Sequence, residues 1–149
     1  MKKETNSKKK LFLTFTLDSE IFAVNATRVL EVISNAQITP VPETTDTIEG
    51  IIQFRGKIIP VFNLNTILNL PVNIVESYIL IVAEVINNLQ KKTIGYIADT
   101  TQHIISVSDD DLLQPLPTGY GYDINFIENI TITDNKALTI LNLDTVFLI

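Results

Sequence analysis

Few side chains in this chain of 149 residues could carry out acid–base, nucleophilic or metal chemistry. There is one histidine, His103, and no cysteine, which excludes two-histidine and thiolate metal sites and cysteine nucleophiles. The sequence contains no serine nucleophile elbow, Walker loop or dinucleotide fingerprint, and its five glycines leave little for phosphate-binding loops. We therefore predict no catalytic residue, no metal site and no cofactor.

The acidic run Asp109-Asp110-Asp111 is the nearest approach to a ligand cluster. It lacks the glycine and the distal glutamate of a calcium loop. A short helical turn capped by Ser108 or Asp109 explains the run better, because acidic side chains favour the positive end of a helix. A metal-assisted hydrolase is therefore the weakest of three functional hypotheses.

Arg55 is a stronger candidate for interaction with a partner. It lies in IIQFRGKIIPV, where two apolar runs flank Arg55-Gly56. Glycine accepts the positive φ of a tight hairpin, so Gly56 is expected to make the turn. The turn does not require arginine, whose guanidinium suits carboxylates and carbonyls on another protein. An exposed arginine that serves only solubility is the alternative.

Composition narrows the class of partner. The net charge is −6 and the hydrophobic content is 46%, so we expect a well-packed domain without the positive surface that nucleic acids or anionic membranes require. No apolar run reaches the ~18 residues of a spanning helix. MKKETNSKKKLFLTFTL has too short an apolar segment for a secretory signal, so residues 1–10 are predicted to be a mobile basic tail and the protein cytoplasmic.

Short apolar runs separated by turn signals favour an all-β barrel or sandwich. One short helix is expected in Asn65–Leu70, with Asn65 as the cap and Pro71 at the end. The expected strands are LFLTFTL, EIFAV, VLEVI, GIIQF, KIIPVFNL, YILIVAEVI, TIGYIA, HIISV, NITI and ALTILNL.

The chain also contains an internal repeat. The segment that begins at Ile48 aligns without gaps to the segment at Ile127, a shift of 79 residues. Upstream, FAVNATRVLEVIS from Phe22 aligns with IGYIADTTQHIIS from Ile94. The repeat predicts two similarly folded small barrels, within which Gly56 and Asn135 hold equivalent turn positions. A chance likeness between β-hairpins is the alternative.

Tyr120 and Tyr122 lie in the glycine-containing loop PTGYGYD. A lid packed over the core is one role for them. A stacking face for a ligand or glycan is the other, and it defines the second functional hypothesis, a small β-barrel ligand- or glycan-binding module.

From Leu11 to the C-terminus the chain resembles the CheW-type chemotaxis coupling proteins. The resemblance is carried by FTLDSEIFAV, RVLEVI, ITPVPETTDTIEGIIQFRGKIIPVFNL, IGYIADTTQHIISV, P-L-P at 115–117 and LTILNLDTVF. It departs from the family pattern at Gln53-Phe54, at Asn63 and at Asp99-Thr100-Thr101.

The resemblance implies a single domain, 11–149, made of two SH3-like five-stranded barrels with a groove between them. The barrels are expected at about 11–88 and 89–149, with the first strand free to belong to either. It implies a non-enzymatic cytoplasmic adaptor that joins the tip of chemoreceptors to the regulatory domain of the chemotaxis histidine kinase, without nucleic acid or membrane insertion. The expected partner-binding residues are Arg55, Glu31, Val29, Gly50, Gly56 and Asp99.

Overall fold

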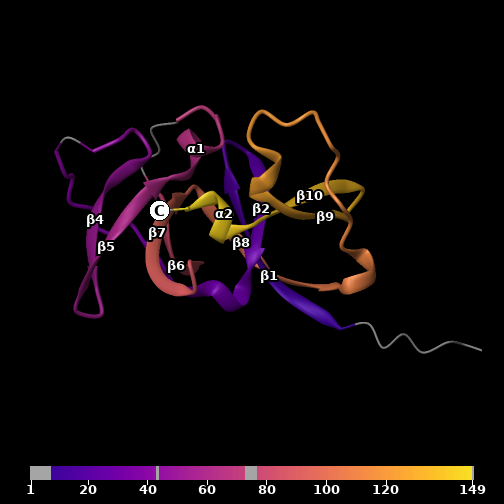
Figure 1. The fold of residues 1–149 in the computed structure, drawn as a ribbon, viewed down its shortest axis with the longest axis horizontal. Coiled ribbons are helices and arrows are strands. Elements are labelled where there is room, and N and C mark those ends of the chain that lie inside the picture. Colours follow the sequence, from indigo (N-terminus) through magenta and orange to yellow (C-terminus); the bar gives the residue numbers. More distant parts are fainter. Residues whose placement is uncertain (1–7, 43, 73–76, 149) are drawn as a thin grey trace, which may run out of the picture.

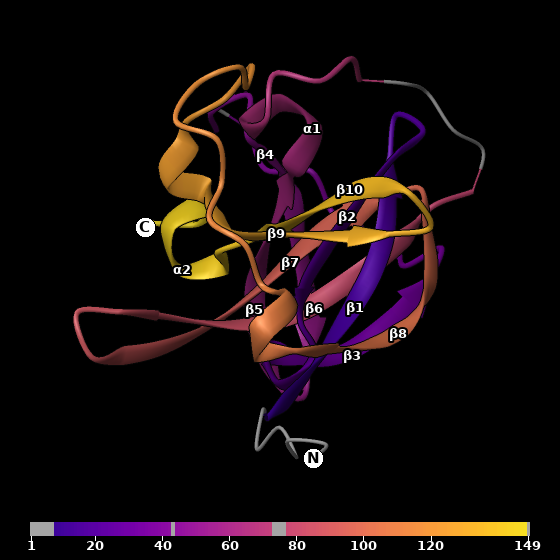
Figure 2. The same cartoon turned by 90° about the vertical axis from the view of Figure 1, so that its right-hand side faces the viewer.

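The computed structural model describes residues 8–42, 44–72 and 77–148; residues 1–7 of the expected basic tail lie outside these ranges. It contains two five-stranded sheets, which lie side by side in Figure 1 and overlap in Figure 2, where the molecule is turned by 90°. The split sheet takes strands from both ends of the chain: β1 (Lys9–Leu17), β2 (Glu20–Asn25), β8 (Thr100–Ser108), β9 (Ile127–Thr133) and β10 (Lys136–Leu141). The continuous sheet comprises β3 (Val29–Ser34), β4 (Ile48–Phe54), β5 (Lys57–Asn63), β6 (Ile79–Asn87) and β7 (Gln90–Ala98).

Each of the ten apolar runs overlaps one of these strands, so the predicted all-β class with two five-stranded units is confirmed. Three runs extend beyond their strands, at Leu64, at Tyr78 and at Asn142-Leu143. The strand orders are β8-β1-β2-β10-β9 and β3-β6-β7-β5-β4. The repeat equates β3, β4 and β5 with β8, β9 and β10, and under that equivalence the two orders are the same. Each sheet therefore combines three repeat strands with a hairpin, β1–β2 or β6–β7.

The structure places β1 in the split sheet, a choice that the sequence left open. Strand β1 pairs with β2 and β8. Strand β7, on the far side of the expected boundary near residue 88, pairs with β6 and, in parallel, with β5. The chain crosses between the sheets at the 3₁₀ turn Ala26–Arg28 and again at Asp99.

Apolar side chains form three clusters. The largest lies between the sheets and includes Phe15, Phe22, Tyr96 and Phe147, whose rings contact one another in a chain with centroid separations of 5.4 to 6.2 Å. The buried residues of the second cluster all belong to strands of the continuous sheet, and those of the third cluster to strands of the split sheet. Alternation within β1 explains the division, because Leu13, Phe15 and Leu17 face the first cluster while Phe12 joins the third.

The short helices α1 (Leu64–Ile67) and α2 (Leu143–Val146) follow β5 and β10. Asn63, not Asn65, caps α1, since its side-chain oxygen accepts a hydrogen bond from the Thr66 amide. The predicted cap was wrong because Asn63 also ends β5, and the extended backbone of a strand end is the geometry an N-cap needs. Asn142 caps α2 in the same way. Figure 1 shows α2 between the two groups of strands.

Gly50 in β4 allows a close backbone approach. A Cβ at this position would lie 2.3 Å from the Thr39 carbonyl oxygen. Thr39 is held there because it exchanges two backbone hydrogen bonds with Ile51. The contact is with backbone, which cannot rotate away.

Gly50→Ala is therefore expected to lower the free energy of unfolding by about 1–3 kcal/mol, measured by urea denaturation. Gly121→Ala is the control, because nothing lies within 4 Å of a Cβ there and its φ is not positive. Equal stability of Gly50→Ala and wild type would contradict the steric role.

Candidate partner-binding site

Arg55 stands at the tip of the β4–β5 hairpin. Arg55 and Gly56 have φ values of 50° and 78°, as expected for the two central residues of a tight β-hairpin turn. The guanidinium carbon of Arg55 lies 4.7 Å from the centroid of the Phe54 ring. Phe54 is itself buried in the second cluster. A cation–π contact thus holds an exposed positive charge over the end of an apolar core.

The backbone at Arg55 does not explain why this residue is arginine. Three other hairpins have the same two-residue turn, and the first central residue is Asp18, Asn88 or Asp134. Asp and Asn tolerate the left-handed region, whereas other side chains are disfavoured there by about 1–2 kcal/mol. Arg55 occupies a position where the fold prefers a shorter polar side chain, which points to a role outside the fold.

Glu31 lies on the edge strand β3. A bulge separates Val29, opposite Ala83, from Glu31, opposite Val82. Glu31 is exposed, as is Val32, while Val29 is half-buried against the inter-sheet cluster. β3 thus presents a carboxylate next to aliphatic surface along an edge, where backbone hydrogen-bonding groups remain available to another chain.

The remaining predicted residues make contacts within the fold. Gly50 is buried beneath Thr39, and Gly56 completes the turn. Asp99 lies where the chain crosses from β7 to β8; its amide donates to the Thr16 carbonyl at 2.9 Å, and its carboxylate accepts from the Asp18 amide at 3.0 Å. Five of the six residues therefore belong to the continuous sheet, but to opposite ends of its strand order: Val29 and Glu31 to β3, and Gly50, Arg55 and Gly56 to the β4–β5 hairpin. Asp99 lies apart from both groups, beside the β1–β2 turn.

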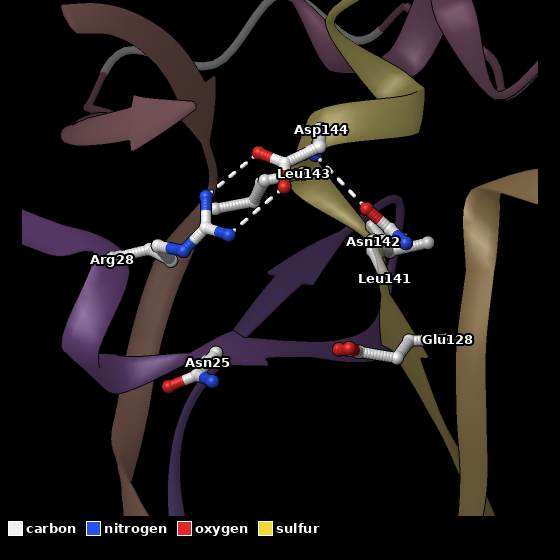
Figure 3. Close-up of a pocket in the computed structure, with 7 residues that line it drawn as sticks. All are labelled: Asn25, Arg28, Glu128, Leu141, Asn142, Leu143 and Asp144. Atoms are coloured by element: carbon white, nitrogen blue, oxygen red, sulfur yellow. Dashed lines mark hydrogen bonds and ion pairs between the residues drawn. The ribbon is translucent and has the colours of Figure 1, made fainter. Parts of the chain in front are cut away.

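A small polar pocket of about 70 Å³ lies at the junction of the sheets (Figure 3). Its lining is Asn25, Arg28, Glu128, Leu141, Asn142, Leu143 and Asp144. Nη1 and Nη2 of Arg28 donate to the two carboxylate oxygens of Asp144 at 2.7 and 2.9 Å, and the Ile86 amide donates to the same carboxylate at 2.7 Å. The clamp joins α2, the segment before β3, and β6. The two charges of the clamp satisfy each other, and a pocket of about 70 Å³ is far smaller than the roughly 300–1,000 Å³ of ligand pockets, so this pocket has little capacity for a ligand.

Hydrogen bonds from Arg28 hold the pKa of Asp144 below its ordinary value, partly opposed by desolvation and supported by the Ile86 amide. A carboxylate whose pKa is lower in the folded than in the unfolded state stabilises the fold above the unfolded pKa of about 3.9. That stabilisation is lost as the pH falls through the folded value.

The melting-temperature difference between wild type and Asp144→Asn is therefore expected to be full at pH 7 and to shrink steadily below about pH 4. Thermal scans by circular dichroism from pH 7 to pH 2.5 measure it. A difference that stays constant through that range would show that the carboxylate charge contributes nothing.

The side chains that could act as acids, bases or metal ligands lie apart from Arg55 and Glu31. His103 is exposed in β8, and Asp109–Asp111 form a 3₁₀ turn. Ser108 occupies the N-cap position as predicted, but its side chain makes no capping hydrogen bond. Within the described ranges, no group of three or more His, Asp or Glu side chains is arranged to hold a metal ion. No described helix is long and apolar enough to cross a membrane.

The tyrosine loop packs back on the fold. Tyr122 is half-buried against the inter-sheet cluster, and its ring centroid lies 5.9 Å from that of Tyr120. The Tyr120 hydroxyl accepts a hydrogen bond from the Leu116 amide. Asn69 donates to the Gly121 carbonyl from the segment after α1. These contacts correspond to a lid and leave the two rings partly covered.

The chain matches the family model of the CheW-like domain over residues 11–148. It belongs to the CheW-like domain family. It is 27% identical to the chemotaxis protein CheW of Treponema pallidum, with 91% of this chain and 80% of that protein covered. For CheW of Thermotoga maritima the identity is again 27%, with coverages of 90% and 85%.

Solved structures agree with this assignment. The scaffolding protein TtCheW from Thermoanaerobacter tengcongensis superposes with a TM-score of 0.84 at 31% identity, covering 95% of this chain and 94% of that one. The CheW-like family is one of scaffold and adaptor proteins. The scaffolding protein TtCheW and this chain therefore share the arrangement of two β-sheets.

Sequence reasoning missed the Arg28–Asp144 clamp. Both residues lie in motifs that carried the family resemblance, RVLEVI and LTILNLDTVF, but they are 116 positions apart. The alignment of the repeat gave one signal, since Asp144 stands where the first half has Asn65. A charged residue that replaces an amide at an equivalent position points to a role specific to one half.

Proposed function

We propose that this chain is a non-enzymatic adaptor that couples the cytoplasmic tip of chemoreceptors to the regulatory domain of the chemotaxis histidine kinase. The observation that carries the proposal is the family match over 11–148 together with close superposition on a scaffolding protein. The protein then acts in the cytoplasm, held at receptor arrays by its partners, with no contact to nucleic acid and no insertion into the membrane.

We place the partner contacts on the continuous sheet. Arg55, Glu31 and Val29 contact the partners directly. Gly50, Gly56 and Asp99 take part by shaping the backbone: the approach of Thr39 to β4, the turn that displays Arg55, and the crossing between sheets. In such an interface the charged groups set orientation and association rate, and buried aliphatic side chains supply affinity.

The state of the sheet edges supports a partner contact at β3, and it shows a second open edge at β8 of the split sheet. Thr39 bridges to Ile51 on β4, and Leu113 bridges to Ile130 on β9, so these two edges are partly covered. No such bridge to β3 or β8 occurs in the described part of the chain. These two strands also carry exposed aliphatic side chains, Val32 at 41% and Ile104 at 59%. An uncovered edge flanked by apolar side chains is a surface that a second protein can extend or cover.

Two calorimetric titrations of the full chain test the proposal, one with the regulatory domain of the kinase from the same organism and one with a receptor cytoplasmic-tip fragment. Saturable binding to both is expected, and an unrelated acidic domain of similar size serves as the control. Saturable binding to neither partner would overturn the adaptor function and leave the fold assignment untouched.

A further inference from the structure

A second pocket, of about 470 Å³, opens on the split sheet, within the range of pockets that hold small ligands. Its lining is Thr14, Ser19, Glu20, Ile21, His103, Ile105, Thr133, Asp134, Lys136, Ala137, Leu138 and Thr139. Leu138 and Ile105 also belong to the third apolar cluster, so the pocket is a continuation of that core toward solvent. It lies on the other sheet from Arg55 and Glu31.

The internal repeat shows why a pocket forms here. Thr133 pairs with Lys136 directly before the β9–β10 turn, and Phe54 pairs with Lys57 at the equivalent place before the β4–β5 turn. In the continuous sheet the Phe54 ring packs into the core and is only 8% exposed. The short Thr133 side chain leaves the corresponding space unfilled. That space is therefore suited to an apolar group of about the size of a phenyl ring.

A bulge in β8 brings His103 to the same pocket. The register between β1 and β8 shifts between Leu13 and Phe15. At this point the buried Thr14 hydroxyl donates to the His103 carbonyl at 3.0 Å and accepts from the His103 amide at 3.1 Å. The hydroxyl thereby replaces ladder hydrogen bonds that the bulge removes, and it fixes the backbone that carries the imidazole.

The pocket is lined by charges of both signs. Glu20 and Asp134 supply two carboxylates, while Lys136 supplies an ammonium group and His103 an imidazole that can donate a hydrogen bond. No hydrogen bond or ion pair of these four side chains is found among the described residues. Groups left without protein partners at the rim of an apolar pocket are those that fix the orientation of a ligand.

We propose that this pocket binds an apolar α-amino acid. The ligand side chain occupies the space that the Phe54 ring fills in the other sheet. Its carboxylate pairs with Lys136 and His103, and its ammonium group pairs with Glu20 and Asp134. A zwitterion pairs with all four groups. An apolar carboxylate leaves Glu20 and Asp134 without a partner, and an apolar amine leaves Lys136 and His103 without one. The inference does not depend on the adaptor function.

Titration of the full chain with L-phenylalanine, followed by amide NMR and ligand-observed NMR, tests the proposal. Saturable shifts are expected for amides of Thr14, His103 and 133–139. Thr133→Phe should weaken binding at least tenfold because it fills the space, while Thr133→Val keeps wild-type affinity. Lys136→Ala should raise the Kd about threefold to fivefold, consistent with an exposed ion pair, and Lys57→Ala, its counterpart in the other sheet, should leave the Kd unchanged.

Ligands that lack one charge complete the experiment. 3-Phenylpropionate and phenethylamine should each bind at least threefold more weakly than L-phenylalanine. Equal binding of these compounds would overturn the assignment of a zwitterion, and unchanged binding by Thr133→Phe, or shifts confined to the continuous sheet, would overturn the site. If Thr133→Phe does not fold, judged by circular dichroism, the Lys136→Ala and Lys57→Ala pair and the shift map decide the question.

Discussion

Replacement of Asp144 by alanine is expected to lower the free energy of unfolding by about 3 kcal/mol, the largest stability effect of any single substitution considered for this chain. Three hydrogen bonds are lost at once, from two guanidinium nitrogens of Arg28 and from the amide of Ile86. Nη1 of Arg28 keeps the Glu84 carbonyl as an acceptor at 3.2 Å, whereas Nη2 and the Ile86 amide lose the acceptor described above. Removing one partner of a buried pair costs about 3–5 kcal/mol. Asp144 and Arg28 keep 31% and 26% of their side-chain surface exposed, so the lower end of that range applies.

A double-mutant cycle measures the energy of the Arg28–Asp144 interaction apart from the other effects of each substitution. It compares the free energies of unfolding in urea of wild type, Arg28→Ala, Asp144→Ala and the double variant. A coupling energy of at least about 1 kcal/mol is expected, because the two side chains touch directly. Glu128→Gln is the matched control, since Glu128 lines the same pocket and is exposed. That control should change stability by no more than about 0.5 kcal/mol. An equal loss in Glu128→Gln would attribute the effect to net charge instead of the clamp.

The clamp is important because, in the described part of the chain, the backbone passes between the two sheets only at Ala26–Arg28 and at Asp99. These two connections do little to fix the position of one sheet relative to the other. Asp144 follows β10 of the split sheet, Arg28 ends the first crossing, and Ile86 belongs to the continuous sheet. The clamp therefore ties the end of one sheet to a strand of the other at a single point. The inter-sheet cluster supplies most of the attraction, but apolar contacts are not directional, whereas two parallel guanidinium–carboxylate hydrogen bonds are.

Local signals in the sequence predicted the elements well. All ten apolar runs became strands, and Arg55-Gly56 and Asp134-Asn135 became tight turns with positive φ at both residues. The pair Asn87-Asn88 is also a turn signal in the sequence, but the turn lies one residue further along the chain, at Asn88-Leu89. The reason is that either asparagine accepts this backbone, so the register of β6 with β7 decides which one does.

Pairing between distant strands could not be predicted in the same way. The hairpins β1–β2 and β6–β7 have the same alternation, so either could complete either group of three repeat strands. The contacts that decide are the parallel pairs β2–β10 and β5–β7. Such pairs join segments far apart in the chain and leave no turn signature between them.

In the candidate sites too, local features could be predicted from the sequence and contacts between distant segments could not. Arg55 and Gly56 were predictable because a hairpin tip is a local feature. The roles of Thr133 against Phe54 and of Arg28 against Asp144 depend on register and on contacts across the molecule. The repeat aligns Thr133 with Phe54, but only the structure shows that Phe54 packs into a core. The repeat does not align Arg28 with Asp144.

Arg55→Asn is expected to weaken binding to the kinase regulatory domain, or to the receptor tip, by about 10- to 100-fold, as for a central interface arginine. Folding should be little affected. Asparagine accepts the φ of 50° more readily than arginine does, and this gain opposes the loss of a cation–π contact of about 0.5–1 kcal/mol. The free energy of unfolding is thus expected to stay within about 1 kcal/mol of wild type.

Lys136→Asn is the control matched in charge, because it removes one positive charge beside the equivalent turn of the other sheet. If the guanidinium makes a specific contact, Arg55→Asn loses affinity and Lys136→Asn does not, in calorimetry at one fixed ionic strength. Equal weakening by both would mean that overall charge steers the association. Wild-type affinity of Arg55→Asn for both partners would show that Arg55 does not belong to the interface. The three equivalent hairpin turns, which have Asp or Asn at this position, show that the fold alone does not require an arginine there.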